Sequence, residues 1–305
     1  HFIINPQACS GKGIKTWLTV KSQLDQQNID YEAYFTKHNM HAAEIARELT
    51  EYSLDIKKII VLGGDGTLNE VINGVLDFSK IFLGYIPSGS SNDFARSLKI
   101  PRDPLAALSN ILKPNHFTSL DYGNIQFLNT KKQDRRFACS SGLGFDANVT
   151  KEALNSNIKD VFNRFGLGKL TYLVIALKQI ILGNFFDATI TANGITKDYH
   201  NIFLISNMIH KYEGGGLAMA PKASPIDGKL DICLVHGLSK IKILFLIPTL
   251  LFGKHIGFKG VEYFKCPDIH IKTSSHINYH TDGESEDSSL ELKVSCIASS
   301  LNMIL

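Results

Sequence analysis

Few features of specialised protein classes occur in this sequence. Its 305 residues contain five cysteines and no CxxC pair, which argues against a disulfide framework or a structural zinc site and favours reduced thiols in a cytoplasmic protein. A net charge of +3 is too small to indicate a nucleic-acid-binding protein. Hydrophobic residues make up 44% and charged residues 20%, so we expect neither a disordered nor a fibrous chain.

Long hydrophobic runs are missing as well. Only Ile241–Gly253 approaches a membrane span; it contains Pro248 and is about a dozen residues long, whereas a spanning helix needs about 20. The first residues are already typical of a strand, so we expect no signal peptide. These absences together predict a soluble protein.

The first 120 residues alternate short apolar runs with amphipathic stretches. This alternation is typical of a doubly wound parallel sheet, in which ligands bind at the carboxyl ends of the strands. Gly, Asn or Ser stands at each strand-to-helix junction. The expected strands are Phe2–Ile4, Tyr31–Phe35, Lys58–Leu62 and Ile81–Ile86. The expected helices are Lys12–Gln27, Ala42–Tyr52, Leu68–Leu76, Asp93–Leu98 and Pro104–Leu112.

The pattern changes after Asp121. Alternating runs there predict antiparallel strands, interrupted by apolar helices at about Lys169–Leu182 and Ser239–Phe252. We therefore predict an α/β domain over residues 1–121 and a β-rich antiparallel sandwich over residues 122–296, and we leave open whether 297–305 returns to the first domain. The expected strands of the second domain include Asp187–Ala192, Tyr199–Ser206, Leu230–Val235, Asp268–Thr273 and Leu290–Cys296.

The strongest local signal is the segment Gly63-Gly64-Asp65-Gly66-Thr67. An apolar strand runs into three glycines around one aspartate and then directly into a helix. Glycine lets a ligand approach the backbone, and the free N–H groups at a helix start bind anions. These features suit a polyphosphate, with Asp65 available for a metal ion. The alternative is a tight turn in which Asp65 or Thr67 caps the helix.

Two further junctions have a similar composition. The loop from Asn5 to Gly13 is not a Walker A motif, because Pro6 replaces the first glycine and Gly13 stands where Ser or Thr is required. It is not a dinucleotide fingerprint either, because Thr16 replaces the last glycine. By itself it is a phosphate loop or a plain turn. The junction Pro87–Phe94 supplies hydroxyl groups and another helix start, and three such loops at one sheet edge would form a nucleotide site.

Together these motifs resemble the catalytic domain of the diacylglycerol kinases, with the soluble bacterial members as the best match. The resemblance continues in family order through a glycine-rich strand turn, a second glycine signature and an Asp-Gly-Glu segment. These later motifs are Ser141–Ala147, Gly214–Pro221 with Asp227–Asp231, and Thr281–Glu284. The resemblance implies the fold shared by NAD kinases and diacylglycerol kinases, and the activity of an ATP-dependent lipid kinase.

The resemblance also implies catalytic roles. Asp282 would be the general base that takes the proton from the lipid hydroxyl. Asp65, Asp121 and Glu284 would hold the catalytic Mg²⁺ against ATP. Clustered carboxylates repel one another unless a divalent cation lies among them, and oxygen ligands favour magnesium. Without the resemblance, Asp282-Gly283 would be interpreted as a hairpin turn.

Further binding residues follow from the same resemblance. A second Mg²⁺ would be held by the Asp227 side chain and the backbone oxygens of Ser224 and Lys229. The ATP site would be lined by Asn5, Pro6, Ser10, Gly11, Thr36, Gly64, Asp65, Gly66, Thr67, Leu68, Asn69, Glu70 and Ser90. One position departs from the family pattern: Cys9 stands where relatives with this long loop have glycine, which leaves the path of the loop open.

Two other activities compete with this interpretation. NAD kinases share the glycine-rich turn, but Asn69-Glu70 and the second-domain motifs rank the lipid kinase ahead. A catalytically silent nucleotide-binding regulator is disfavoured because the acidic residues are present. His276 and His280 have the spacing of one strand face, yet no cysteine lies nearby to complete a zinc site, so we favour a surface or partly buried role for them.

The substrate and partners are less determined. A diacylglycerol-like lipid is the expected acceptor, but the sequence does not identify it. The helices Lys169–Leu182 and Ser239–Phe252 have flanking lysines, so they would either contact the inner face of the membrane or pack onto the second-domain sheet, which we favour. The oligomeric state is open, with a homodimer as the default for an enzyme of this kind.

Overall fold

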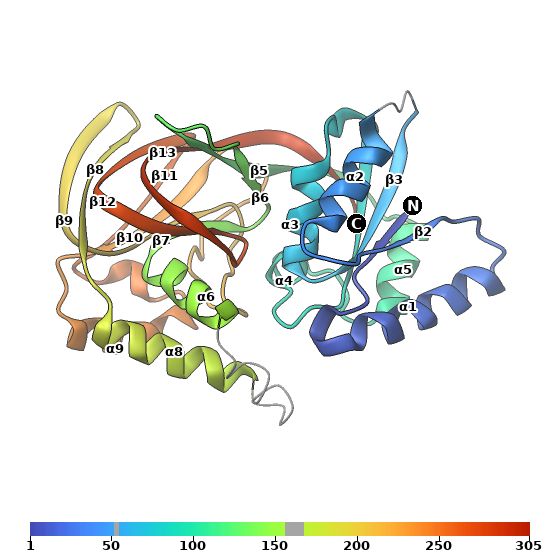
Figure 1. Cartoon of the computed structure of the whole chain (residues 1–305), viewed down its shortest axis with the longest axis horizontal. Coiled ribbons are helices and arrows are strands. Elements are labelled where there is room, and N and C mark those ends of the chain that lie inside the picture. Colours follow the sequence, from blue (N-terminus) through green and yellow to red (C-terminus); the bar gives the residue numbers. More distant parts are fainter. Residues whose placement is uncertain (52–54, 156–167) are drawn as a thin grey trace.

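The computed structural model of the chain describes residues 1–51, 55–155 and 168–305. Figure 1 shows two lobes, an α/β lobe on the right that contains both termini and a β-rich lobe on the left. The predicted fold class, an α/β domain followed by a β-rich antiparallel one, is confirmed by this arrangement.

The α/β lobe is built on a sheet of parallel strands, in the order β4, β3, β1 and β2. These strands are β1 (Phe2–Ile4), β2 (Ala33–Phe35), β3 (Lys57–Gly63) and β4 (Ile81–Pro87). The helices of the lobe are α1 (Ala8–Gln26), α2 (His41–Glu51), α3 (Asp65–Gly74), α4 (Asp93–Leu98) and α5 (Pro104–Leu112), and a 3-10 turn, η1 (Phe78–Lys80), precedes β4.

Side-chain alternation explains why helices cover both faces of this sheet. In β1, Ile3 belongs to a buried cluster with residues of α2 and α3, whereas Ile4 belongs to a second cluster with Trp17 of α1 and Leu108 of α5. Successive side chains of a strand point to opposite faces, so a strand that is apolar throughout needs a cover on each side. The lobe is therefore doubly wound, as the alternation predicts.

The β-rich lobe consists of antiparallel pairs. Its strands are β5 (Phe117–Phe127), β6 (Arg135–Phe137), β7 (Ser140–Gly144), β8 (Phe186–Ala192), β9 (Ile195–Met208), β10 (Leu230–His236), β11 (Val261–Cys266), β12 (Asp268–Thr281) and β13 (Glu284–Ile304). Its helices are α6 (Phe145–Asn155), α8 (Gly168–Leu182) and α9 (Lys240–Leu250), followed by the 3-10 turn η2 (His255–Gly257).

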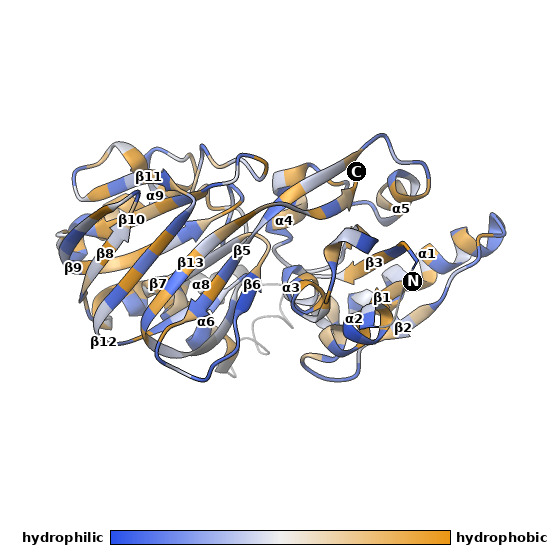
Figure 2. Ribbon diagram, turned by 90° about the horizontal axis from the view of Figure 1, so that it is seen from above, coloured by the Kyte–Doolittle hydropathy of each residue, from blue (hydrophilic) through white to orange (hydrophobic). Residues whose placement is uncertain are grey.

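The sheet of this lobe closes on itself, because β9 and β12 each pair with both β7 and β8. Ile205, Ile232 and Ile271 lie in the enclosed core. In Figure 2 the long strands β12 and β13 carry alternating hydrophobic and hydrophilic bands, as expected for strands with one buried face. Ile243 of α9 and Ile180 of α8 belong to a separate cluster that covers the sheet from outside.

The strands β5 and β13 extend from the β-rich lobe into the α/β lobe. In β13, Met303 pairs in parallel with Leu83 of β4, and the same strand pairs with β5 along its length. The pairing of β13 with β5 shifts register between Ile297 and Leu301. The last residues thus lie in the α/β sheet, and we propose residues 1–121 with 297–305 as one domain and 122–296 as the other.

Candidate active site

Three loops meet at the carboxyl ends of β1, β3 and β4. The Asn5 side-chain amide donates to Thr67 Oγ1 at 3.0 Å, which joins the loop after β1 to the loop after β3. The Ser88 amide donates to the Gly63 carbonyl at 2.8 Å, which joins the loop after β4 to the same loop. The structure therefore brings the three glycine-containing junctions together at one edge of the sheet.

Glycines allow these loops to touch. A Cβ added to Gly89 would lie 2.5 Å from the Gly64 Cα, so neither backbone has room for a side chain. A Cβ on Gly66 would come within 2.3 Å of Glu284 Oε1. Gly66 thus admits a carboxylate from the far end of the chain to the loop after β3.

The loop after β1 has an unusual backbone. Cys9, Ser10 and Gly11 have φ values of 49°, 57° and 87°, in the left-handed region, and the regular part of α1 begins at Lys12. Consecutive amides in such turns form concave anion-binding sites. Cys9 therefore adopts a glycine-like conformation, and its Sγ lies 3.8 Å from Ser90 Oγ of the loop after β4. The sequence alone does not determine the path of this loop; in the structure it runs beside the loop after β4.

Asp65 stands at the start of α3 and caps the next helix, α4. Its carboxylate accepts hydrogen bonds from the amides of Asp93 at 2.9 Å and Phe94 at 3.3 Å. Burial raises the pKa of Asp65 to about 7; the charges of Asp93 and Asp282 add to this effect, and the two amide donors oppose it. The protein thus holds a carboxylate at the three glycine-containing loops that is costly to ionise without a cation.

Asp93 is a site residue that sequence reasoning did not identify. Its side chain is buried, burial raises its pKa, and its Oδ1 makes no hydrogen bond. Its Oδ2 accepts from the Gly215 amide at 2.7 Å, and Arg96 Nε lies 3.6 Å from Oδ1. The available signal was a carboxylate in the first turn of a helix that follows a glycine-serine loop.

Asp282 occupies the turn between β12 and β13. Asp282 and Gly283 have φ values of 50° and 82°, so the Asp-Gly pair does form the expected two-residue hairpin. The Asp282 carboxylate nevertheless points inward and accepts four hydrogen bonds of 2.7–3.0 Å. The donors are the backbone amides of Ala138, Cys139 and Ser140 and the side-chain amide of Asn69. Burial raises the pKa of Asp282, and these donors oppose that rise.

The carboxylates of Asp65 and Glu284 are the candidate ligands for a magnesium ion at these loops, although among the described residues these two and Asp93 do not form a group whose oxygens all lie within 4.8 Å of one another. They are hard oxygen donors, they lie on or against the phosphate loops, and the negative charge of Asp93 raises the pKa of Asp65. Asp93 Oδ1 is buried without a hydrogen bond, but Arg96 Nε lies 3.6 Å from it, so a guanidinium charge already faces the oxygen that a metal ion would otherwise satisfy.

Asp121 makes its contacts in another part of the molecule. Its side chain is buried, and its two oxygens accept the amides of Gly228 at 2.7 Å and Ser299 at 2.8 Å. The Asp121 amide donates to the Pro225 carbonyl at 2.7 Å. These bonds hold β5 to β13 and to the loop before β10. A role of Asp121 in the catalytic magnesium network stays a prediction that these contacts do not support.

Asp227 is held by a lysine. Lys265 Nζ lies 2.6 Å from Asp227 Oδ2 and 3.1 Å from Asp231 Oδ2, and the Lys229 amide donates to Asp227 Oδ1 at 3.2 Å. A second Mg²⁺ at the Asp227 side chain and the oxygens of Ser224 and Lys229 would meet an ammonium group already paired with the carboxylate, and like charges repel. The residues present therefore do not fit that ion.

The other residues expected around ATP differ in their contacts. The Thr36 amide donates to the Ile4 carbonyl at 2.9 Å, which places Thr36 beside the loop after β1. Leu68 is fully buried in the core, Asn69 is directed to Asp282, and Glu70 Oε2 accepts the Ala42 amide at 3.0 Å. The expectation that Leu68, Asn69 and Glu70 line the nucleotide site gains no support from these side-chain contacts.

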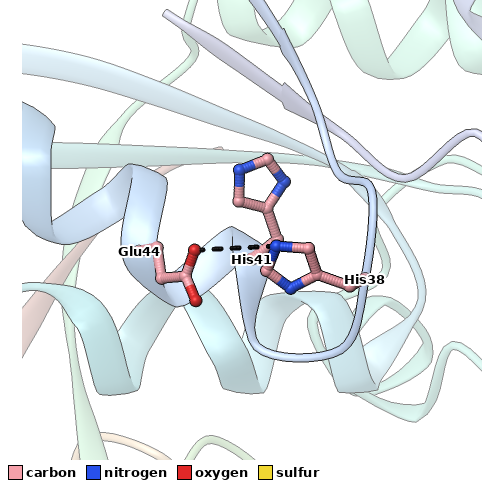
Figure 3. A group of neighbouring side chains, drawn as sticks. All are labelled: His38, His41 and Glu44. Atoms are coloured by element: carbon pink, nitrogen blue, oxygen red, sulfur yellow. Dashed lines mark ion pairs between the residues drawn. The ribbon is translucent and has the colours of Figure 1, made fainter.

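A group of histidines lies near Thr36 at the surface. Figure 3 shows His38, His41 and Glu44, whose ligand atoms lie within 4.8 Å of one another. The imidazole rings stack at 4.6 Å, and His41 Nδ1 accepts the Lys37 amide at 3.0 Å. His38 Nε2 also lies 3.8 Å from Glu44 Oε2, so these contacts hold the loop before α2 against the first turn of that helix.

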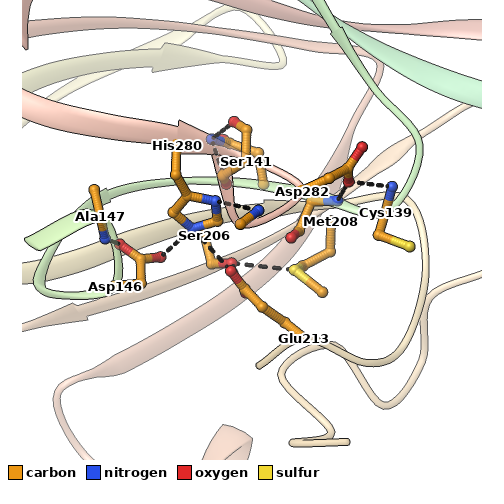
Figure 4. A network of polar contacts seen from close by, with 12 residues as sticks. Cys139, Ser141, Asp146, Ala147, Ser206, Met208, Glu213, His280 and Asp282 are labelled. Atoms are coloured by element: carbon orange, nitrogen blue, oxygen red, sulfur yellow. Dashed lines mark hydrogen bonds and ion pairs between the residues drawn. The ribbon is translucent and has the colours of Figure 1, made fainter. Parts of the chain in front are cut away.

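His280, which the sequence analysis discounts, lies in a buried polar network (Figure 4). Its Nε2 lies 2.9 Å from Glu213 Oε1 and 3.5 Å from Asp146 Oδ2. Burial lowers the pKa of His280, but these two carboxylates outweigh that effect and raise it to about 10. His276, by contrast, is exposed and near Ser288. The two histidines therefore have different environments, and the alternation of strand residues alone does not show it.

Comparison with known proteins identifies the family. Residues 1–125 match the diacylglycerol kinase catalytic domain, and residues 140–305 match the YegS C-terminal NAD kinase beta sandwich-like domain. Over 287 residues the chain is 33% identical to the protein named "Putative lipid kinase YtlR" of Bacillus subtilis, with 93% of this chain and 92% of that protein covered. The chain belongs to the diacylglycerol kinase family.

Other members of the family agree with this assignment. A protein named diacylglycerol kinase from Mycobacterium tuberculosis is 25% identical over 288 residues, covering 92% of this chain and 87% of that protein. A crystal structure of a diacylglycerol kinase from Bacillus anthracis has a TM-score of 0.75 at 24% identity, covering 99% and 95% of the two chains, which shows the shared fold.

The expected resemblance is thus confirmed. The chain is an enzyme of the lipid kinase type, a phosphotransferase, and membership of a kinase family implies the use of ATP. Within the described ranges, each helix is too short or too polar to cross a bilayer.

Proposed function

We propose that this kinase transfers the γ-phosphoryl group of ATP to the hydroxyl of a diacylglycerol-like lipid, with Asp282 as the general base. One observation carries the proposal: Asn69, four residues after Asp65 on α3, donates a hydrogen bond to Asp282. A carboxylate of the β-rich lobe is therefore held beside the helix whose first turn would bind phosphate. Phosphoryl transfer needs mainly this alignment of an acceptor with the nucleotide.

The hydrogen bonds of Asp282 suggest how it accepts a proton. A carboxylate accepts about four hydrogen bonds, and Asp282 already has four donors. Three of the donors are backbone amides that the fold fixes, whereas the Asn69 amide is on a side chain that can rotate. The lipid hydroxyl would take the place of the Asn69 amide at Oδ2 and pass its proton to that oxygen.

The bond changes in this reaction balance. The lipid oxygen bonds to the γ-phosphorus, the bond from that phosphorus to the β–γ bridging oxygen breaks, and ADP leaves with the electron pair. Asp282 takes the hydroxyl proton. A bound Mg²⁺ would neutralise charge on the phosphate oxygens. Asp65 and Glu284 would hold this ion beside Asp93, and the amides of Cys9, Ser10 and residues 64–67 would bind the phosphates.

The acceptor determines where the enzyme works. Acyl chains of a diacylglycerol-like lipid remain in a bilayer, so the proposal includes transient contact with the inner face of the membrane, where ATP is available. The five cysteines are all unpaired, which suits a reducing cytoplasm. A homodimer stays a prediction, and light scattering of the purified enzyme tests it.

A transfer assay with γ-labelled ATP and a total lipid extract tests the proposed function. We expect label in a lipid product with the wild type and none with Asp282→Asn, and a panel of pure lipids then identifies the acceptor. Label transferred to NAD but to no lipid would replace the proposal by the NAD kinase alternative. ATP binding without label on any acceptor would favour the silent regulator.

A further inference from the structure

The helices α8 and α9 present large apolar side chains to solvent. In α9, Ile241 is 69% exposed and Phe245 75%, and Phe252, just after the helix, is 74% exposed. At the end of α8, Ile181 and Leu182 are more than half exposed. We call the area formed by Ile181, Leu182, Ile241, Phe245, Leu251 and Phe252 the α8–α9 surface. Contiguous apolar area of this kind on a protein marks an interaction site.

The packing of α9 shows that this exposure is not a failure to form a core. Ile243, Leu246 and Leu250, on the other face of the helix, are buried in the cluster that covers the sheet. Ile241 and Phe245 are four residues apart, which places them on one face of the helix, and Phe252 follows in the turn after it. The α9 helix is therefore apolar on both faces. The packing role favoured by the sequence analysis accounts for one face only.

The two helices lie next to each other on one side of the β-rich lobe. In Figure 1 they run along its lower edge, and Lys240 Nζ donates to the Ile181 carbonyl at 2.5 Å where their ends meet. The exposed residues at the end of α8 and the start of α9 thus belong to one continuous surface.

The segment that contains α9 has charge of one sign, whereas on α8 Lys178 is paired with Glu152. Between Gly237 and Val261 the chain has four lysines, Lys240, Lys242, Lys254 and Lys259, and neither aspartate nor glutamate. Lys242, Lys254 and Lys259 are exposed. Apolar side chains surrounded by lysines complement a bilayer with anionic headgroups, in which the apolar groups enter the acyl boundary and the lysines pair with the lipid charge.

We propose that the α8–α9 surface docks this kinase on an anionic bilayer. The inference deepens the proposed function, because it names the surface by which an enzyme for a membrane lipid reaches its substrate. Docking itself needs neither ATP nor an acceptor, so it is measured independently of catalysis.

Flotation with vesicles tests this proposal. The wild type should float with vesicles of phosphatidylcholine containing about 30% phosphatidylglycerol, float less with pure phosphatidylcholine, and detach as salt is raised. The double variant Phe245→Ser/Phe252→Ser should lose about tenfold or more in affinity for the anionic vesicles. Because both side chains are exposed, folding should be preserved, as thermal melting checks.

Matched variants separate the contributions. Ile195→Ser removes another exposed apolar side chain, at the start of β9 in the same lobe, and it should leave flotation unchanged. Lys242→Gln/Lys254→Gln should weaken binding and reduce its salt dependence. Unchanged flotation of the Phe245/Phe252 variant would overturn the proposal. If that variant instead converts a dimer to a monomer without affecting flotation, the occupant is a second copy of the chain and the proposal is also wrong.

Failure of the proposed function gives a different result. If no lipid is phosphorylated but the wild type still floats and the double variant does not, docking stands and the catalytic proposal falls. If the double variant phosphorylates a short-chain acceptor in detergent as fast as the wild type but loses activity on vesicles, both proposals are supported.

A second inference rests on the buried network around His280. His280 lies two residues before Asp282 on β12, and its Nδ1 is 3.4 Å from the Gly283 amide nitrogen. On its other side it pairs with Glu213, which also accepts the Ser206 hydroxyl at 2.9 Å. Gly142 provides the space, because a Cβ there would lie 2.6 Å from His280 Nε2.

The loop that begins at Glu213 reaches the other half of the site. Glu213 and Leu217 pair with each other, which closes a loop whose Gly215 amide donates to Asp93. Asp93 in turn donates its amide to Asp65. One five-residue loop therefore contacts the strand end that carries the proposed base and the carboxylate beside the proposed magnesium ligands.

We infer that Glu213 and His280 are positioning residues, which hold the Asp282 turn in place relative to the phosphate loops. The inference rests on the proposed role of Asp282. In His280→Ala, kcat should fall by about 100-fold, the cost of misplacing a reacting group by about 1 Å, while KM for ATP changes little. His280→Gln keeps a donor for Glu213 and should restore part of the activity.

Hydrogen exchange gives a readout that does not depend on catalysis. The backbone amides around residues 280–284 should exchange faster in His280→Ala than in the wild type, and those in β1 should not change. The control His200→Gln breaks an exposed histidine–aspartate pair of 3.0 Å in the same lobe and should alter neither activity nor exchange. Full activity with unchanged exchange in His280→Ala would end this inference, whereas an inactive wild type would count against the proposed function alone.

Discussion

The side-chain amide of Asn69 donates a hydrogen bond to Asp282 Oδ2 at 2.8 Å, although 213 positions separate the two residues. The bond joins the helix after the glycine-rich loop to the turn between β12 and β13 of the β-rich lobe. A hydrogen bond donated to a carboxylate stabilises its charged form, so Asn69 lowers the pKa of Asp282 against the burial that raises it.

Asn69→Ala should therefore change the pH dependence of the reaction. Loss of the donor raises the pKa of Asp282, so the base is protonated at higher pH and the acid limb of the kcat/KM profile should move upward in pH. We expect kcat/KM near neutral pH to fall by about 10-fold, whereas kcat at saturating lipid changes little, because the bound hydroxyl has already displaced the Asn69 amide from Asp282. Rates measured across a pH series check this.

Asn73→Ala is the matched control for this variant. Asn73 lies one turn further along α3 and donates, like Asn69, to the Arg136 carbonyl, but it makes no bond to Asp282. Its removal should leave the acid limb where it is. If both variants shift the limb equally, the effect arises from the contacts that the two residues share, namely the Arg136 carbonyl and the hydrogen bond from Asn73 to Asn69 Oδ1.

Stability without metal should depend on the ionisation of Asp65. The unfolded chain loses this proton near pH 3.8, whereas the folded protein keeps it until about pH 7. The folded state binds more protons between these values, so the free energy of unfolding falls as pH rises from about 4 to about 7, by at most about 4 kcal/mol. Asp65→Asn should therefore raise the melting temperature without Mg²⁺, and the gain should be larger at about pH 8 than at about pH 5.

Asp77→Asn is a control, because the fold lowers the pKa of Asp77 whereas it raises that of Asp65. Hydrogen bonds from Ser79 lower the pKa of Asp77, so its removal should reduce stability or leave it unchanged. Added Mg²⁺ should stabilise the wild type near pH 8 and have a much smaller effect on Asp65→Asn. If Asp65→Asn melts below the wild type at every pH, ionisation of Asp65 does not destabilise the folded protein.

Much of this fold follows from local patterns in the sequence. Ile59–Leu62 is apolar throughout and ends at three glycines, and a strand buried on both faces that enters a helix accounts for all of these features. The strands β12 and β13 were predicted to be shorter than they are. Polar residues at Ser274–His276 interrupt the alternation of β12 before it resumes at Ile277, and the register shift there makes the interruption possible.

Only those residues of the candidate site that belong to a contiguous sequence motif could be predicted. Gly66 and Asp282 stand in recognisable motifs, but the pairing of Lys265 with Asp227 depends on the register of β10 and β11, which places Asp231 opposite Lys265. The burial of His280 likewise depends on α6 and on the loop from Glu213. Contacts between distant segments of this kind leave no periodic trace in the sequence.

Gly66→Ala should separate the role of Glu284 from folding. The added methyl group would meet Glu284 Oε1, the end of a flexible side chain, so the carboxylate can move aside with little loss of stability. We expect a melting temperature close to that of the wild type and a Mg²⁺ requirement shifted to higher concentration, because one proposed ligand is displaced. Kinetic titration with Mg²⁺ measures this.

Gly257→Ala, at a position with open space around the new methyl group, is the comparison for Gly66→Ala and should behave as the wild type. A Gly66→Ala enzyme with an unchanged Mg²⁺ requirement would remove Glu284 from the proposed ion site.

Because Lys265 pairs with Asp227, the stability of the loop before β10 should not depend on magnesium. Its ammonium group neutralises Asp227 and Asp231 together, and Asp231 is completely buried. Lys265→Met leaves the buried Asp231 carboxylate with the Tyr263 hydroxyl but without its cation, which costs up to about 3–5 kcal/mol and should lower the melting temperature by several degrees. In this variant two carboxylates become available to a cation, so added Mg²⁺ should recover part of the loss. Asp227→Asn in the wild-type background identifies the alternative: if Mg²⁺ stabilises the wild type and Asp227→Asn abolishes that effect, a divalent ion binds at Asp227 in spite of the lysine.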